Sequence, residues 1–257
     1  MFEKLDKAGI LVWNQAPVYQ LPNDRLNRPA IRRAALRVNQ ATVEANVNHP
    51  SILAWSIANE LGSEPTEFGV VGPGYSTFVK QTAAAVRRLD NTRLVAIDRH
   101  SRLGEPAYYP ALRRLDAIGV NEYFGWYQSA LPWLPESRTE DLLSWLDDIH
   151  QQYPRTPLFI TEYGAEASRA GDVNEKGTYD FQARWSSDHT ILQGSRSFVN
   201  ASIVWALKDF RVHPAWSGGN PVPEPPWNNK GLIHEGGKPK PAFYVMAKLF
   251  RATNQFK

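Results

Sequence analysis

The chain has no cysteine and only two methionines among its 257 residues. Without cysteine there is no disulfide, no thiolate metal site and no cysteine nucleophile. No run of apolar residues reaches the roughly 20 that a membrane-spanning helix needs, so we expect no membrane partner. The chain also has no large excess of charge of one sign, with 29 Lys and Arg against 26 Asp and Glu. These absences exclude disulfide scaffolds, thiol enzymes and membrane-spanning proteins.

The small basic excess does not indicate a nucleic-acid partner. Its densest cluster, Arg28, Arg32, Arg33 and Arg37, falls on a predicted helix and is typical of a solvated face. Residues 1–6 lack the charged and then apolar pattern of a signal peptide. That favours a cytoplasmic protein, although the compartment stays open because the start of the sequence can be incomplete.

The composition is that of a globular enzyme with one large core. Hydrophobic residues make up 42% of the chain and charged residues 21%. The length is close to the roughly 250 residues of a β/α barrel. Nine tryptophans and an aromatic content of 12% suit a sugar-binding cleft, although most aromatic side chains are expected in the core.

Apolar runs and amphipathic segments alternate along the whole chain. Strands are predicted at 10–13, 51–58, 94–98, 115–121, 158–162 and 201–207, and helices at 2–8, 29–41, 75–89, 140–151, 179–192 and 241–252. The helix from residue 29 is expected to bury Ile31, Ala34, Ala35, Val38 and Ala41. This alternation indicates an α/β fold with a parallel sheet, and the six strands compare with eight in a closed (β/α)8 TIM-type barrel.

Two of the predicted strands end in the same way, with a glutamate followed closely by glycine. One ends at Asn59 and Glu60, and the other ends at Glu162. Polar residues of a buried parallel strand gather at its carboxyl end, which is the catalytic rim of a β/α barrel. A glycosidase needs two carboxyl groups there, one to protonate the leaving oxygen and one to attack or to activate water. A lone glutamate is usually a loop acid, whereas this matched pair predicts a catalytic role for Glu60 and Glu162.

Four segments in the right order carry a resemblance to glycoside hydrolase family 2, which contains β-galactosidases, β-glucuronidases and β-mannosidases. Residues 48–52 with Trp55, Asn59 and Glu60 resemble its acid/base signature. Residues 161–165 resemble its nucleophile segment, and residues 204–210 are similar to its eighth strand. Residues 121–127 resemble the sixth-strand segment of β-glucuronidases, although Glu122 stands where arginine is usual.

The resemblance implies a role for each matched residue. Glu60 would end the fourth barrel strand as acid/base, and Glu162 would end the seventh as nucleophile of a retaining mechanism that needs no metal or cofactor. Asn59 would bind the sugar 2-hydroxyl, and Tyr123 would orient Glu162. The pocket would be completed by Trp205 as its floor and by Asn121 and Tyr127, with plain core packing as the alternative for Trp205 and Tyr127.

Substrate choice depends on a shorter match. Asn228 to Gly231 resembles the Asn-x-Lys element with which β-glucuronidases hold the sugar carboxylate, so Asn228 and Lys230 are predicted to bind substrate. The alternative is that Lys230 is a surface lysine before a turn. A β-glucuronidase is therefore favoured, with a β-galactosidase of the same family next and another retaining barrel glycosidase, of the cellulase-like kind, after it.

The sequence also departs from the family. Its upstream β-sandwich domains and the first two barrel strands are missing, and Asn14-Gln15 replaces an acidic pair at the end of the third strand. We therefore expect a single catalytic domain over residues 1–257, shortened at its N-terminus. Exposed sheet edges would favour a homo-oligomer, a missing partner or aggregation. The remaining alternative is a catalytically inactive, sugar-binding barrel fragment.

Overall fold

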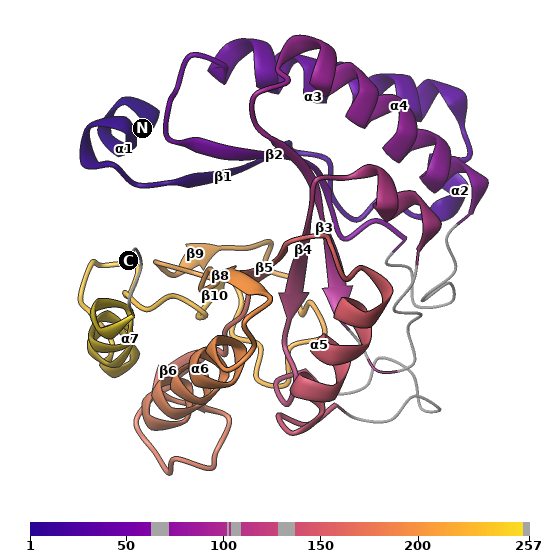
Figure 1. The fold of residues 1–257 in the computed structure, drawn as a ribbon. Coiled ribbons are helices and arrows are strands. Elements are labelled where there is room, and N and C mark those ends of the chain that lie inside the picture. The colour runs from indigo at the N-terminus through magenta and orange to yellow at the C-terminus, as the bar shows by residue number, and fades with distance from the viewer. Residues whose placement is uncertain (63–71, 102, 104–108, 128–136, 254–257) are drawn as a thin grey trace. The chain divides into compact units, whose positions relative to one another are not determined.

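The structure is a computed structural model that describes residues 1–62, 72–101, 103, 109–127 and 137–253 (Figure 1). Its largest sheet has six strands, whose order in the sheet follows the chain. These strands are β1 (Val12–Gln15), β2 (Ile52–Asn59), β3 (Leu94–Ser101), β4 (Ala117–Glu122), β5 (Leu158–Glu162) and β8 (Val199–Ser202). The pairs β1–β2 and β2–β3 are parallel. The predicted α/β sheet of about six strands is thus confirmed.

The chain divides into two compact units. The first comprises residues 1–100, 104–120 and 148–159, and the second residues 101–103, 121–147 and 160–257. Helices of the first unit are α1 (Phe2–Ala8), α2 (Asn23–Leu26), α3 (Pro29–Asn46), α4 (Pro73–Leu89) and the 3-10 helix η1 (Pro110–Arg114), while α5 (Asp141–Gln152) has residues in both. The second holds β6 (Ala167–Arg169), β7 (Gly177–Thr178), α6 (Tyr179–Gly194), β9 (Phe210–Arg211), β10 (Trp227–Asn228) and α7 (Pro241–Ala252).

The core of the first unit forms where strands meet helices. Strand β2 is almost wholly apolar and buried, as expected of a strand covered on both faces. Helices α3 and α4 pack side by side (Figure 1). Helix α4 is amphipathic, and most of the residues that it buries are apolar: Tyr75, Phe78, Val79, Ala83, Ala85 and Val86. A further apolar cluster joins Ala96, Ala117 and Phe159 to Trp13, Leu53 and Leu94.

The predicted buried face of α3 is confirmed at Ala35 and wrong at Val38 and Ala41, which are exposed. The helix buries Ala35, Asn39 and Val43, whereas Val38 is exposed. The Asn39 amide donates to the carbonyl oxygens of Ala35 and Ile57, both at 3.0 Å. A polar side chain with its hydrogen bonds satisfied can lie in a core, and here it turns the helix toward β2.

Helix α6 of the second unit buries a mainly polar face. Its buried residues are Phe181, Gln182, Trp185, Ser186, His189 and Gln193. The helix begins at a Thr178 cap, whose hydroxyl oxygen accepts a hydrogen bond from the Phe181 amide at 3.2 Å. Helices α6 and α7 pack against each other. No described helix is both long and apolar enough to cross a membrane.

The last predicted strand is shorter than expected and starts earlier. Strand β8 ends at Ser202, although the prediction ran to residue 207. The chain beyond it still donates backbone hydrogen bonds, from Ile203 to the Ile160 carbonyl at 2.8 Å and from Trp205 to the Tyr163 carbonyl at 2.9 Å. Trp205 is therefore aligned with the end of β5 by backbone bonding alone.

Candidate functional site

Glu60 follows β2 directly and has an uncommon backbone conformation. Its φ of 52° lies in the left-handed region, which residues other than glycine rarely adopt. The Glu60 amide donates to the Asp98 carbonyl at 2.9 Å, and the neighbouring Asn59 pairs with residues 18–20 through backbone bonds of 2.8 and 2.9 Å. Conformations of this kind cluster at functional sites, which makes the strain at Glu60 consistent with its predicted role.

The Glu60 carboxylate is 8% exposed and contacts side chains from two other segments. Gln20 Nε2 donates to Oε2 at 3.0 Å, and His100 Nδ1 lies 3.2 Å from Oε1. Both oxygens are thus held by polar groups. Sequence reasoning missed Gln20 and His100, although a histidine near the carboxyl end of a predicted strand was an available signal.

A second carboxylate of the first unit, Asp98 on β3, links three strands by hydrogen bonds. It is buried and accepts hydrogen bonds from Trp13 Nε1 at 3.0 Å, from Ser56 Oγ at 2.7 Å and from Gln15 Nε2. Asn59 lies opposite Asp98 in the register of β2 and β3. Gln15, which stands where the family resemblance leads one to expect an acid, is therefore an amide donor to a neighbouring carboxylate.

In the second unit, Glu162 ends β5 and is half-buried. The Tyr123 hydroxyl, just beyond β4, donates to Glu162 Oε2 at 2.8 Å. Thr161 and Asn121 are the last residues but one of β5 and β4, and the Thr161 hydroxyl donates to Asn121 Oδ1 at 2.9 Å. The structure thus brings together three residues predicted from the sequence, Asn121, Tyr123 and Glu162.

Lys230 lies beside these residues, and three aromatic rings surround its ammonium. Its side chain is 1% exposed, so the alternative of a surface lysine is wrong. Its ammonium lies 5.5 Å from the ring centre of Tyr123, 5.7 Å from that of Trp126 and 4.7 Å from that of Tyr127. It donates to the Tyr127 hydroxyl at 2.7 Å and contacts Glu166 Oε1 at 3.4 Å.

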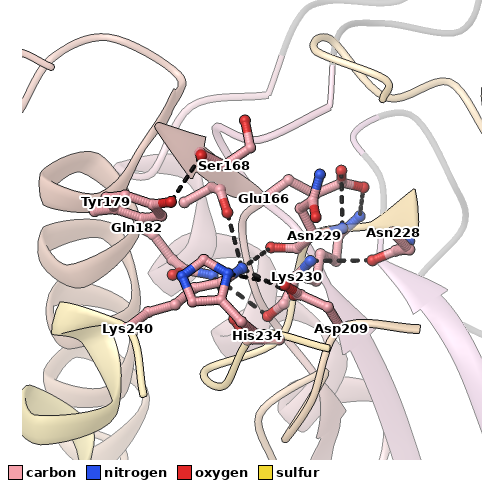
Figure 2. Close-up of polar contacts among 12 residues, drawn as sticks. Glu166, Ser168, Tyr179, Gln182, Asp209, Asn228, Asn229, Lys230, His234 and Lys240 are labelled. Carbon is pink, nitrogen blue, oxygen red and sulfur yellow. Dashed lines mark hydrogen bonds and ion pairs between the residues drawn. The ribbon is translucent and has the colours of Figure 1, made fainter. Parts of the chain in front are cut away.

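A buried polar network anchors the backbone around Lys230, and Figure 2 shows its members. The Asn228 side chain accepts from the Lys230 amide at 3.1 Å, so it shapes this loop. Glu166 Oε2 accepts from the Asn229 amide at 3.2 Å. Gln182 of α6 donates to the carbonyl oxygens of Ala165 at 2.9 Å and Gly231 at 3.2 Å. Sequence reasoning missed Glu166 and Gln182.

Trp205 presents an exposed ring in the second unit. Its relative exposure is 39%, so plain core packing does not describe it. The ring contacts Phe210 edge-on, with 5.7 Å between the ring centres, and the Trp205–Ala206 peptide is cis. A Cβ atom at Gly164 would collide with the Trp205 carbonyl oxygen, so this close approach needs glycine. An exposed indole held by its backbone can pack on a sugar face.

One group of side chains within the described ranges has the composition of a metal site. Asp209, His234 and Glu235 place potential ligand atoms within 4.8 Å of one another. However, the Lys240 ammonium already contacts Asp209 Oδ1 at 2.8 Å and supplies a positive charge there (Figure 2).

Comparison with known proteins gives a family for the chain and several named relatives. Residues 2–251 match the family model described as glycosyl hydrolases family 2, TIM barrel domain. A β-glucuronidase of Bacteroides fragilis is 27% identical over 262 residues, which covers 95% of this chain and 34% of that protein. The Homo sapiens β-glucuronidase is 23% identical over 97% of this chain and 36% of its own length. The chain thus spans about a third of the length of these relatives.

Solved structures resemble the chain over nearly its whole length. An FMN-binding β-glucuronidase from Facaelibacterium prausnitzii superposes with a TM-score of 0.80 at 26% identity, over 98% of this chain and 36% of that one. A β-galacturonidase from Eisenbergiella tayi, bound to galacturonate, gives a TM-score of 0.81 at 22% identity, over 100% of this chain and 43% of that one. The second likeness shows a shared fold.

Proposed function

Because the chain belongs to glycosyl hydrolases family 2 through its TIM barrel domain, we propose that it forms the active site of a retaining β-glycosidase that hydrolyses terminal β-linked sugars, with β-glucuronides favoured. Glu162 is the nucleophile and Glu60 the acid/base. The relatives named above as glucuronidases and a galacturonidase act on uronides, which supports a sugar acid as the substrate class.

One observation carries the uronide assignment: Tyr123 contacts both the candidate nucleophile and the candidate carboxylate reader. Its hydroxyl donates to Glu162 at 2.8 Å, and its ring lies 5.5 Å from the Lys230 ammonium. A sugar whose anomeric carbon meets Glu162 would therefore reach Lys230 with another part of the same ring. A buried ammonium needs an anion or hydrogen-bond acceptors, and the carboxylate of a uronic acid supplies both.

The chemistry follows from the two carboxyl groups. Protonated Glu60 gives its proton to the glycosidic oxygen while Glu162 attacks the anomeric carbon, so the aglycone leaves as an alcohol and the sugar becomes an ester of Glu162. Glu60, now a carboxylate, takes a proton from water as that water attacks the same carbon and frees Glu162. This retaining path requires the two carboxyl groups to lie about 5–5.5 Å apart.

The other predicted residues act on the sugar itself. Asn59 binds the 2-hydroxyl, a hydrogen bond that strengthens in the transition state. Tyr123 orients Glu162, and the exposed indole of Trp205 forms the floor under the ring. Asn121 and Tyr127 line the pocket, and Asn228 holds the loop that presents Lys230.

The test is turnover of two substrates that differ in the carboxylate. We expect the chain to hydrolyse 4-nitrophenyl β-glucuronide in preference to the β-galactoside, and Glu162→Gln to lower this rate by at least about 10⁴-fold. Lys230→Met should lower kcat/KM for the glucuronide by about 100-fold, because a charge-assisted hydrogen bond contributes about 1.5–3 kcal/mol. Lys238→Met, at an exposed lysine of the same region, is the matched control and should change neither rate.

Three outcomes would contradict parts of this proposal. A preference for the galactoside would retain the two glutamates and remove the carboxylate role of Lys230. Equal loss of both substrates in Lys230→Met would assign that lysine to packing. Turnover of neither substrate, by a chain that melts cooperatively, would favour the inactive sugar-binding fragment.

The organisation of the chain is proposed on the same grounds. We place one catalytic domain over residues 1–257. Ile10 and Leu11 beside β1, and Ile203 and Leu207 beyond β8, are exposed apolar residues. Such residues next to strand edges favour self-association or a further segment that covers them. Size-exclusion chromatography with light scattering would detect a dimer.

A further inference from the structure

Glu122, at the end of β4, is completely buried and takes no part in the chemistry proposed above. Its Oε1 lies 2.7 Å from Nδ1 of His189, which is also completely buried, and accepts from Gln193 Nε2 at 2.6 Å. Its Oε2 accepts from the Phe124 amide at 3.2 Å. A carboxylate removed from water persists only when it is paired and hydrogen-bonded, and here three donors serve both oxygens.

Two of these donors, His189 and Gln193, come from one face of α6. Trp185, His189 and Gln193 follow one another at a spacing of four, so they lie on the same side of the helix. Trp185 stacks on the imidazole, with ring centres 3.6 Å apart, and donates from Nε1 to the Phe124 carbonyl at 3.2 Å. This helix face therefore binds both the Glu122 side chain and the backbone of the turn that follows β4.

The turn after β4 contains Tyr123, which hydrogen-bonds the candidate nucleophile Glu162. Glu122 bonds the Phe124 amide, so its side chain spans Tyr123 and fixes the backbone on both sides of it. The Tyr123 hydroxyl then donates to Glu162 Oε2 at 2.8 Å. On its far side the imidazole is fixed as well, since His189 Nε2 lies 3.3 Å from the Thr139 hydroxyl.

We propose that the buried Glu122–His189 pair is a positioning device, which sets the place of Tyr123 and, through it, of Glu162. The inference rests on the proposed role of Glu162 as nucleophile. The hydrogen bonds that the structure gives to Glu122 and His189 lead to Gln193, Phe124 and Thr139, so we infer that both act on Glu162 through Tyr123. A displacement of about 1 Å at a reacting group lowers rates by about 100-fold, which is the size of effect expected here.

Two variants break the pair and one keeps part of it. His189→Phe removes the donor and retains a ring for Trp185, and Glu122→Gln removes the charge and turns an amide toward the Phe124 N–H. His189→Asn retains a donor close to the position of Nδ1. The matched control is Ser186→Ala, because Ser186 is buried on the same helix and its hydroxyl has no hydrogen-bond partner among the described residues.

The first readout separates placement from stability. With every variant folded by circular dichroism, kcat for 4-nitrophenyl β-glucuronide should fall about 100-fold in His189→Phe and Glu122→Gln, with KM within about twofold of wild type. The rate at which a 2-deoxy-2-fluoro-glucuronosyl fluoride labels Glu162, followed by intact mass, should fall by the same factor. His189→Asn should recover most of the loss, and Ser186→Ala should resemble wild type.

Unchanged kcat and labelling in folded His189→Phe and Glu122→Gln, beside an active wild type, would overturn the inference and leave the proposed function intact. If the wild type neither turns over nor labels, the proposed function fails instead. Crystal structures of His189→Phe, Glu122→Gln and Ser186→Ala then decide the inference by themselves. A Tyr123 hydroxyl beyond hydrogen-bond distance of Glu162 in the first two alone supports it, and an unmoved hydroxyl overturns it.

Discussion

Asp90 in the first unit and Asp209 in the second are both buried and both paired with a cation, yet their pKa values move in opposite directions. Asp90 contacts Arg93 Nη1 at 2.6 Å, and Asp209 contacts Lys240 Nζ at 2.8 Å. The pKa of Asp90 lies well below its ordinary value, and the pKa of Asp209 lies above it. An opposite charge at close range therefore does not determine how a buried carboxylate behaves.

The number of donors explains Asp90. Burial raises its pKa, but this effect is outweighed by hydrogen bonds that favour the ionised form, from Thr92, Arg93 and Trp55. Thr92 donates from its amide at 2.8 Å and from its hydroxyl at 2.6 Å, and Trp55 Nε1 donates at 2.8 Å. Together with Arg93, these donors serve both carboxylate oxygens.

Asp209 has fewer donors for the same burial. Burial raises its pKa more than the Lys240 ammonium lowers it, and burial likewise lowers the pKa of Lys240. Within the described chain, Asp209 Oδ2 has no hydrogen-bond donor. The ammonium is also shared, since it donates to the carbonyl oxygens of Ala167 and Asn229, both at 2.8 Å. A buried charge is thus stabilised by its full set of hydrogen bonds.

The largest effect is expected from Lys240→Met, which removes the ammonium that contacts Asp209 at 2.8 Å and also donates to two backbone carbonyls. Breaking a buried pair from one side costs about 3–5 kcal/mol, and we expect that loss in the free energy of unfolding by urea. Adding Asp209→Asn should restore about 1–2 kcal/mol, because the uncompensated charge is then gone. If Lys240→Met alone were as stable as wild type, the Asp209–Lys240 pair would make no net contribution to stability and this account would be wrong.

Asp90→Asn should be next, with a loss of about 2–3 kcal/mol at pH 7, because a buried network loses its charge. The folded pKa of Asp90 lies below the ordinary value of 3.8. Its contribution is therefore complete above that pH and is lost as the pH falls through the folded value. From pH 5 to pH 3.5 the urea midpoint should fall less in the variant than in wild type, with pH 7 as the reference, and parallel curves would refute this account.

Asp209→Asn should have the smallest effect, about 1 kcal/mol at pH 7. The folded pKa of Asp209 is raised, so its contribution is present below the ordinary value and is lost as the pH rises through the folded value. At pH 7 the neutral amide replaces a charge that burial already disfavours. The matched pair of asparagine variants, measured in one buffer, tests the comparison directly, and a loss equal to that of Asp90→Asn would end it.

Much of the fold could be predicted because its signals are local. The alternation of apolar runs with amphipathic segments located every strand of the main sheet, with β8 misplaced by its continuation at Ile203. Glu60 and Glu162 were predicted as site residues from their places at strand ends, which the structure confirms, and Lys230 from a short motif; their roles stay predictions. In each case a few neighbouring residues carry the information.

The rest depends on partners that are distant in the sequence. His189 meets Glu122 across 67 residues and Gln182 meets Gly231 across 49, so no local pattern marks these polar side chains as buried. The buried Asn39 misled the prediction of the α3 face for the same reason, since its partner Ile57 lies on another element. The glutamate at position 122, unusual for the resembling segment, meets His189 and Gln193 only once α6 is in place.

The close approach at Gly164 has a consequence for the size of ligand that the proposed site can hold. Any side chain there would displace the Trp205 carbonyl and with it the segment that bears the exposed indole. Gly164 also lies two residues after Glu162 on the same stretch of backbone. In the proposed site, the spacing between the Glu162 carboxylate and the Trp205 indole, and with it the thickness of a sugar ring that fits there, depends on a residue that has no side chain.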